Sequence, residues 1–378
     1  MQIDARRTDD TLTLELTGRL DINSAPALGR ELGLDGVRRL VLDFDRCAYV
    51  SSAGLRELLR AQKQLAAAGG TMLLTNVGRE VQEILDMTGF SSLIPTRRKV
   101  REVSIDGLEF LSAGVCGECY RLDRETILKL YNDGIGADVA EKEKEFARAA
   151  FVAGIPTAIS YDVVTCGSRT GVVYEMLDAT LFSTVIRNDL ANVDRHARKL
   201  ADIARTVHAT TAPPGVFPDI KDNFRRYLAQ MDFFLSPDEI AFLRRKLEAI
   251  PDAANCVHFD LHTSNVMMRG DEPVIIDMGD FSRGHYLFDI GLMCTIYGPE
   301  LAISEMVTKI PNEAGAQLLE TFLDSYFADR PRDERAFFER NRHFLASLRL
   351  IYTITFFPRL RDQLAHNVKN VLLPRMGD

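Results

Sequence analysis

Three residues with oxygen-bearing side chains are spaced in the second half of the chain as phosphoryl transfer requires. Asp260 follows the β-like segment 256–258, and Asn265 comes five residues later. Asp277 ends the apolar run 274–276, which follows a turn-forming Gly-Asp-Glu-Pro sequence. Asp260 would orient the proton of an attacking hydroxyl, while Asn265 and Asp277 would hold Mg²⁺, which prefers oxygen ligands. A single Asp here is usually a turn residue or a helix cap, but the joint spacing favours phosphoryl transfer from ATP.

The two motifs that carry these residues resemble the aminoglycoside phosphotransferase and choline kinase superfamily. The motifs are His258-Phe259-Asp260-Leu261-His262, with Asn265 behind it, and Ile276-Asp277-Met278-Gly279-Asp280. The resemblance implies a two-lobed, protein-kinase-like fold, with ATP and Mg²⁺ as cofactors and a small-molecule hydroxyl as the acceptor. Phe259 stands where the family usually has glycine, which leaves the size of the acceptor open.

A glycine-bearing turn between two predicted strands precedes this region. Gly114 and Gly117 lie in the turn, where the lack of side chains would let backbone groups approach phosphates closely. The next predicted strand, 126–131, places the lone Lys129 in an otherwise apolar run. By the family resemblance Lys129 would pair with the α and β phosphates of the nucleotide. The alternative is a surface lysine on an edge strand.

The resemblance also implies an acidic residue that holds Lys129 and a hinge that binds adenine. The predicted helix after this strand carries Glu145, which we expect to pair with Lys129. Glu141, one turn earlier on the same face, is the alternative. Backbone groups at Glu175 and Met176, in the predicted hinge, are expected to bind the adenine ring.

Cys116 and Cys119 have the spacing of a redox or metal-binding motif. No second cysteine pair or histidine-rich stretch completes a zinc site, so we interpret both residues as small members of the glycine-bearing turn. The chain's 6 cysteines show no disulfide framework of the kind found in secreted mini-domains, and we expect reduced thiols.

Two polar residues of the predicted helical region are assigned supporting roles. His208 ends a predicted helix, and we expect it in the core or at a cap rather than in catalysis. Asp289 matches a family aspartate that braces the catalytic loop. From residue 300 onward the sequence is helical in pattern, with aromatic residues at the spacing of a buried face.

The first 96 residues alternate predicted strands and helices, which indicates an α/β domain with a mixed sheet. They resemble the STAS domain of anti-sigma-factor antagonists through the motifs 18–21, 49–55 and 88–90. The resemblance implies Ser52 as a regulatory phosphosite, with Ser51 where many members have Asp, and an anti-sigma-factor-like protein as a partner. The helix dipole would favour a phosphate at this position. Equally, Ser51 or Ser52 is expected to act only as an N-cap.

Composition limits the classes of partner. A net charge of -8 argues against nucleic acid as the main partner, because such partners demand clustered Lys and Arg. The N-terminal sequence lacks the apolar core of a signal peptide. The longest candidate span, 344–357, is shorter than the roughly 18 residues that cross a bilayer and contains Arg349. We therefore expect a cytoplasmic protein without nucleic-acid or membrane partners.

These features predict a STAS domain at 1–96, a linker at 97–104, a sheet-containing nucleotide lobe at 105–178 and a helical lobe at 179–378. The last two form the expected α+β, kinase-like domain. The expected function is Mg-ATP-dependent phosphotransfer to a small-molecule hydroxyl, with the STAS module as sensor or docking surface. Two alternatives stay open. The protein could act as an antagonist-like signalling protein that binds nucleotide without catalysis, or it could phosphorylate a protein such as its own Ser52.

Overall fold

The computed structural model describes residues 1–377. The chain divides into two compact units, residues 1–103 and residues 104–378. Among the described residues, no helix combines the length and the apolar composition needed to cross a membrane.

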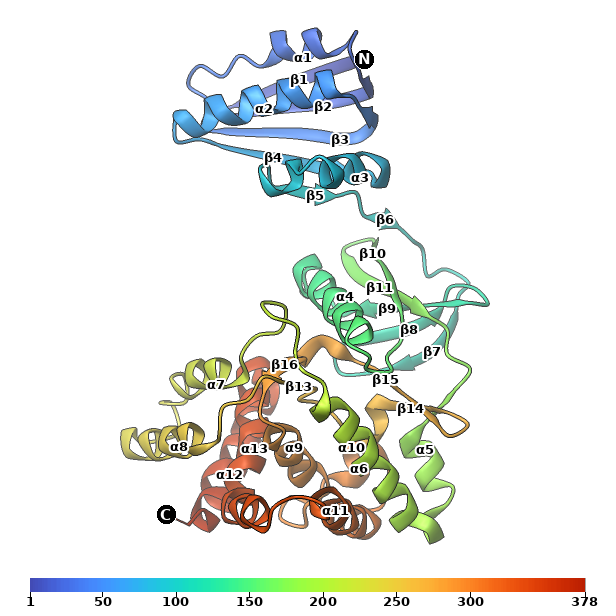
Figure 1. Ribbon diagram of the computed structural model, residues 1–378, viewed down its shortest axis with the longest axis vertical. Helices are drawn as coiled ribbons and strands as arrows, with labels where there is room; N and C mark the ends of the chain where they lie inside the picture. The colour runs from blue at the N-terminus through green and yellow to red at the C-terminus, as the bar shows by residue number, and fades with distance from the viewer. Residues whose placement is uncertain (378) are drawn as a thin grey trace. The chain divides into compact units, whose positions relative to one another are not determined.

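The first unit is an α/β domain on a five-stranded mixed sheet (Figure 1). The strand order is β1-β2-β3-β4-β5, in which β1 and β2 are antiparallel and the other neighbours are parallel. The elements are β1 Gln2–Thr8, β2 Thr11–Leu20, α1 Ala25–Glu31, β3 Arg39–Val50, α2 Ser52–Ala67, β4 Thr71–Val77, α3 Arg79–Met87 and β5 Thr96–Arg98. The predicted mixed-sheet α/β fold of the N-terminal region is confirmed.

The core of the first unit follows from the two periodicities in its sequence. In β2 every second residue is buried, including Leu14 and Leu16, because side chains alternate across a strand. In α2 the buried face includes Leu58, which is fully covered. Gly54 lets this helix approach β2, since an added Cβ would lie 2.6 Å from the side chain of Leu20. The start of α2 is therefore fixed against the end of β2.

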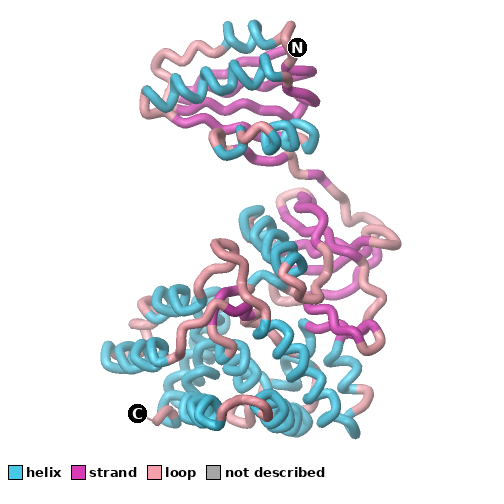
Figure 2. Tube along the Cα trace, in the orientation of Figure 1, coloured by secondary structure: helices cyan, strands magenta, loops and turns pink. Residues whose placement is uncertain are grey.

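The second unit begins with an antiparallel sheet covered by one helix (Figure 2). Within this unit the strands run in the order β10-β11-β9-β8-β7. Helix α4 contacts β10 and β11. The elements are β7 Glu109–Ala113, β8 Gly117–Arg121, β9 Thr126–Tyr131, α4 Ala137–Val152, β10 Ser160–Cys166 and β11 Arg169–Glu175; the short β6 (Arg101–Glu102) precedes them. This arrangement presents two side chains of β9, those of Lys129 and Tyr131, to Glu143 of α4.

The rest of the second unit is mainly helical, with five short strands that carry the loop of interest. Its main elements are β12 Thr180–Leu181, α5 Phe182–Arg187, α6 Val193–Ala209, α7 Ile220–Leu228, α8 Pro237–Ala249, β13 Asn255–Val257, β14 Val266–Arg269, β15 Glu272–Ile275, β16 Ser282–Gly284, α9 Leu287–Tyr297, α10 Ser304–Thr308, α11 Asn312–Phe327, α12 Arg332–Phe356 and α13 Arg361–His366. Every residue of α9 is buried, as expected for a helix that is apolar on all sides. The helix α12 packs along α9 and reaches the loop after β13.

Candidate active site

The loop after β13 is held by a buried carboxylate. Asp289 of α9 accepts hydrogen bonds from the backbone N–H groups of His258 (2.9 Å) and Phe259 (2.6 Å). His208 of α6 bonds the same carboxylate through Nε2 at 2.8 Å and bonds the hydroxyl of Tyr326 through Nδ1 at 2.7 Å. Each of these groups is buried, so the network fixes the loop to the helices α9, α6 and α11. Asp289 thus braces the loop, and His208 is a core residue.

Phe259 occupies a backbone conformation that favours glycine. Its φ is 61°, in the left-handed region where a Cβ is unfavourable by roughly 1–2 kcal/mol. Its ring is buried and makes edge contacts with Phe224 of α7 and Tyr352 of α12, both at 5.4 Å between centroids. The backbone geometry explains why the resembled family usually has glycine here, and the aromatic contacts offset part of the strain.

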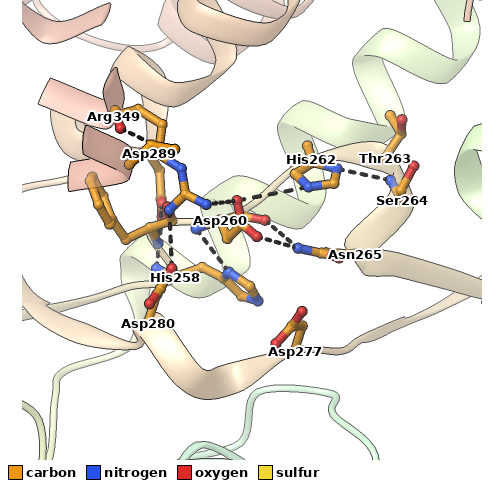
Figure 3. A network of polar contacts seen from close by, with 12 residues as sticks. His258, Asp260, His262, Thr263, Ser264, Asn265, Asp277, Asp280, Asp289 and Arg349 are labelled. Carbon is orange, nitrogen blue, oxygen red and sulfur yellow. Dashed lines mark hydrogen bonds and ion pairs between the residues drawn. The ribbon is translucent and has the colours of Figure 1, made fainter. Parts of the chain in front are cut away.

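Asp260 and Asn265 contact each other (Figure 3). The Nδ2 of Asn265 donates to the Oδ2 and to the backbone oxygen of Asp260, each at 2.9 Å. The other carboxylate oxygen of Asp260 forms an ion pair with Arg349 of α12 at 2.7 Å. His262 lies 3.8 Å from the same oxygen, and burial lowers the pKa of this histidine. The carboxylate is therefore held in one orientation by two neighbours.

Asp277 is joined to the sheet by an ion pair. Its Oδ1 lies 2.9 Å from the Nζ of Lys129, whose Nζ also lies 2.7 Å from the Oε1 of Glu143. Burial favours the neutral acid of Asp277, but the Lys129 ammonium outweighs it and holds the pKa of this carboxyl below its usual value. Burial alone would lower the pKa of Lys129, but Asp277 and Glu143 raise it. Lys129 and Asp277 are therefore both charged at neutral pH.

Glu143, not the predicted Glu145, is the partner of Lys129. The side chain of Glu143 is 4% exposed on the inner face of α4, whereas Glu145 and the alternative Glu141 are exposed. Because successive helix residues are about 100° apart, a shift of two positions moves a side chain away from the sheet. Glu143 also accepts a hydrogen bond from the hydroxyl of Tyr174 at 2.8 Å. The expectation of Glu145 used its distance along the sequence, which does not show which face of α4 contacts the sheet.

The glycine-bearing turn between β7 and β8 is a tight hairpin. The N–H of Gly114 donates to the carbonyl of Gly117 at 2.8 Å, and the side chain of Asn132 donates to the carbonyl of Val115 at 2.9 Å. Gly117 must be glycine, because an added Cβ would lie 2.2 Å from the backbone oxygen of Leu130. The tip of the hairpin also carries the exposed side chain of Val115, and the phosphate-binding role of Gly114 and Gly117 stays a prediction.

Cys116 and Cys119 lie on this hairpin, and Cys119 stands opposite Lys129 in the β8–β9 register. Burial raises the pKa of both thiols, which keeps them protonated and weakly nucleophilic. The described residues contain no group of three or more His, Cys, Asp and Glu side chains placed to bind a metal ion. Nothing in their surroundings favours the zinc or redox interpretation.

The predicted hinge offers fewer free donors than expected. The N–H of Glu175 donates to the carbonyl of Ile159 at 3.0 Å, and the N–H of Met176 donates to the carbonyl of Glu125 at 2.6 Å. The carboxylate of Glu175 accepts from the N–H of Ile159 at 2.9 Å. Both amide hydrogens at the predicted adenine contact are thus engaged within the chain.

Two residues of this site escaped the sequence argument. Arg349 and Tyr352, one turn apart on α12, reach the loop from nearly 90 residues downstream. Arg349 contacts Asp260 and also pairs with Asp280 at 3.0 Å (Figure 3). The hydroxyl of Tyr352 donates to Asp280. The usable signal was an arginine inside an otherwise apolar run, which marks a charge that needs a buried partner.

Ser52 lies on the first unit, where the predicted switch position opens α2. Its side chain is exposed. Ser51 is the N-cap, and its side chain accepts a hydrogen bond from the N–H of Gly54 at 3.4 Å. The capping role therefore belongs to Ser51, which leaves the Ser52 hydroxyl facing solvent.

Comparison with known proteins separates the same two units. Residues 109–338 match the phosphotransferase enzyme family, and residues 2–103 match the STAS domain. The N-terminal part is similar to BtrV of Bordetella bronchiseptica, whose name places it among anti-sigma factor antagonists, with 36% identity over 98 residues, 25% of this chain and 84% of that protein. The anti-sigma-B factor antagonist of Bacillus subtilis is 24% identical over 105 residues, 26% of this chain and 93% of that protein.

A solved structure shares the fold of the second unit. It is a thermostable mutant of aminoglycoside phosphotransferase APH(4)-Ia in a ternary complex with AMP-PNP and hygromycin B. The two chains are 14% identical, and the similarity covers 72% of this chain and 96% of that one with a TM-score of 0.51. At this identity the likeness concerns the fold alone, and it agrees with the predicted two-lobed architecture.

Proposed function

Because the chain belongs to the phosphotransferase enzyme family and carries a STAS domain ahead of it, we propose that it transfers the γ-phosphoryl group of Mg-ATP to a small-molecule hydroxyl. The observation that supports this most is the line of charges from three separate segments: Glu143 of α4, Lys129 of β9 and Asp277 after β15. Glu143 and Lys129 are 4% and 17% exposed, and burying such charges seldom helps folding, because desolvation offsets their attraction. Their arrangement is suited to holding a polyphosphate and a cation.

The residues present fit Mg²⁺. Asn265 uses its Nδ2 on Asp260, which leaves its side-chain oxygen as a free ligand atom. The carboxylate of Asp277 is 45% exposed and negatively charged, so it is accessible to a cation. Mg²⁺ commonly takes one or two protein oxygens and completes its shell with phosphates and water. When bound, the ion would neutralise charge on the transferred group.

Asp260 is the residue placed to handle the acceptor's proton. The acceptor oxygen would form a bond to the γ-phosphorus, and the bond from that phosphorus to the β,γ-bridging oxygen would break with its electron pair leaving on ADP. The hydroxyl proton would pass to the carboxylate of Asp260, whose orientation is set by Asn265 and Arg349. Lys129, held by Glu143, would bind the phosphates and keep them aligned.

The test is Mg-ATP turnover, measured as ADP release, in the wild-type protein and in Asp260→Asn. Loss of a general base commonly lowers the rate by about 10² to 10⁴, while nucleotide binding measured by calorimetry should persist. Asp324→Asn, on an exposed carboxylate of α11, is the matched control and should turn over normally. Rates of wild type and Asp260→Asn within twofold of each other would remove Asp260 from the proposed role.

A second candidate function concerns the STAS domain. Ser52 is exposed, and the domain is 36% identical to a protein named as an anti-sigma factor antagonist, which favours a phosphorylation-controlled docking surface. Incubation with Mg-ATP followed by phosphosite mapping would detect transfer to Ser52. Stoichiometric phosphorylation of Ser52 in the wild type, but not in Asp260→Asn, would show that the chain phosphorylates itself. Its absence from both would favour the small-molecule acceptor.

A further inference from the structure

A chain of hydrogen bonds runs from a partly exposed arginine to the loop that carries Asp260. The Nη2 of Arg330 donates to the hydroxyl oxygen of Tyr326 at 3.0 Å, and this hydroxyl lies 2.7 Å from the Nδ1 of His208. The Nε2 of His208 lies 2.8 Å from Asp289, which accepts two backbone N–H groups of the loop. The chain therefore reaches the backbone directly before the proposed base.

Arg330 is held in place at the outer end of this chain. Its Nη1 donates to the carboxylate of Glu334 at 3.0 Å. The Cζ of its guanidinium lies 4.0 Å from the centre of the Tyr286 ring and 4.7 Å from the centre of the Tyr326 ring. A planar guanidinium that is stacked on aromatic faces and paired with a carboxylate has few other positions available. Its Nη2 is therefore kept at the oxygen of Tyr326.

The chemistry of these groups gives each hydrogen bond a direction. A guanidinium has donors and no acceptor, so the oxygen of Tyr326 accepts from Arg330. Burial raises the pKa of Tyr326, so its hydroxyl keeps a proton that it can donate to the Nδ1 of His208. The carboxylate of Asp289 accepts, so the Nε2 of His208 carries a proton at the other end. His208 is then neutral, with its single ring proton on Nε2.

The opposite direction would leave a buried donor without a partner. If the Nδ1 of His208 were also protonated, the oxygen of Tyr326 would accept from two cations. The hydroxyl proton of Tyr326 would then face no acceptor among residues 1–377, although this residue is only 1% exposed. A buried donor without a partner loses its hydrogen bonds to water and gains none in return, so this state is disfavoured.

We propose that Tyr326 is a positioning residue: its hydroxyl holds His208 as the neutral ring protonated on Nε2, and Asp289 then holds the loop of the proposed base, Asp260. This inference rests on the proposed phosphotransfer and adds to it a residue of α11. The position of the loop matters because a base must lie within hydrogen-bond reach of the proton that it accepts, roughly 2.6–3.2 Å between heavy atoms.

The first experiment observes the ring nitrogens of His208 by NMR on the full chain labelled with ¹⁵N-histidine. The resonances are assigned with His208→Gln, which keeps a donor for Asp289. In the wild type at neutral pH, Nδ1 should resonate as an unprotonated ring nitrogen and Nε2 as a protonated one. In Tyr326→Phe the Nδ1 resonance should shift, because this nitrogen loses the hydrogen bond from the tyrosine hydroxyl.

The second experiment measures turnover as ADP release per folded molecule. Tyr326→Phe keeps the ring and should lower kcat about tenfold to a hundredfold, because a small displacement of a reacting group is costly. The KM for Mg-ATP should stay within about twofold, because Lys129 and Asp277 lie outside the chain of hydrogen bonds. Tyr286→Phe is the matched control, since its hydroxyl donates to Glu334 at 2.7 Å and its ring is kept. Both constants should stay within about twofold in this control.

Three outcomes would overturn the inference. They are a protonated Nδ1 of His208 in the wild type, an Nδ1 resonance that does not move in Tyr326→Phe, and equal kcat values for Tyr326→Phe and Tyr286→Phe. The NMR measurement needs no nucleotide, so either of the first two results contradicts this inference alone. A wild type that neither binds nor hydrolyses Mg-ATP would contradict the proposed function itself.

Discussion

The two units of the chain differ in what they bury. In residues 1–103 the buried polar side chains are Ser24 and Gln82, and the rest of the core is apolar. The second unit buries charged groups as well, such as Glu143 at 4% exposure and Asp289 at 1%. Apolar burial stabilises a fold, whereas buried charge is costly unless it is fully paired. The contrast agrees with the proposal that the second unit holds a charged ligand.

Backbone strain divides the units in the same way. In the first unit, left-handed non-glycine residues are Asp9 and Asn76, which tolerate this conformation through their short polar side chains. In the second unit the left-handed non-glycine residues are Phe259, Asp277, Ala302 and Lys309, and the first two belong to the candidate site. Phe259 is poorly suited to this conformation, so packing must hold it there. Strain at residues that carry the site is a further sign of function.

The largest expected effect on folding comes from the buried brace. Asp289→Ala leaves the N–H groups of His258 and Phe259 buried without an acceptor, which should lower the free energy of unfolding of the second unit by about 2–6 kcal/mol. Tyrosine fluorescence suits the measurement, because of the chain's 10 tyrosines only Tyr49 lies in the first unit. A loss no greater than that of the exposed control Asp324→Ala would contradict the bracing role.

In the first unit the largest effect should come from an apolar truncation. Leu58→Ala removes a fully buried side chain of α2 and should lower the free energy of unfolding of that unit by about 2–5 kcal/mol. Hydrogen exchange should rise in peptides of residues 1–103, while ADP release per folded molecule stays the same. If Leu58→Ala loses turnover while hydrogen exchange in the second unit stays as slow as in the wild type, then the activity of the second unit depends on the stability of the first.

A smaller effect is expected from removing the ion pair between Glu143 and Lys129. Glu143→Gln removes the charge that faces Lys129 and should lower kcat/KM for Mg-ATP about tenfold to a hundredfold, or roughly 1.5–3 kcal/mol. Glu145→Gln, two residues away on the exposed side of α4, is the control and should stay within twofold of the wild type. Equal losses in both variants would mean that helix stability, not the ion pair, is being measured.

The smallest expected effect separates the two serines at the start of α2. Ser51→Ala removes the N-cap and should destabilise the first unit by about 1 kcal/mol, whereas Ser52→Ala should change its stability by less than about 0.5 kcal/mol. Chemical denaturation followed by circular dichroism can resolve this difference. A larger loss of stability in Ser52→Ala than in Ser51→Ala would show that Ser52, not Ser51, caps the helix.

Much of the fold could be predicted, because local patterns decide it. The alternating apolar residues of β2 and the helical spacing of α2 gave those elements within a few residues. The spacing of Asp260, Asn265 and Asp277 identified a group of residues, and the structure joins the first two directly by hydrogen bonds. In each case the signal lies within one short stretch of sequence.

What could not be predicted depends on contacts between distant segments. The choice of Glu143 over Glu145 is a matter of helix rotation against the sheet, which spacing along the chain does not determine. Arg349 reaches Asp260 only because α12 packs along α9. The engaged N–H group of Met176 depends on a loop from another part of the sheet. These features are set by tertiary packing.

The central claim is that the second unit buries charge in order to bind Mg-ATP. The most direct test is a calorimetric titration with ATP. It is done with and without Mg²⁺, on the wild type and on Asp277→Asn. Asparagine tolerates the left-handed backbone at residue 277, whose φ is 66°, so the change removes charge and little else. The account predicts that Mg²⁺ tightens ATP binding at least about tenfold in the wild type, that this gain disappears in Asp277→Asn, and that the melting temperature does not fall. The same Mg²⁺ effect in both proteins, or none in the wild type, would contradict it.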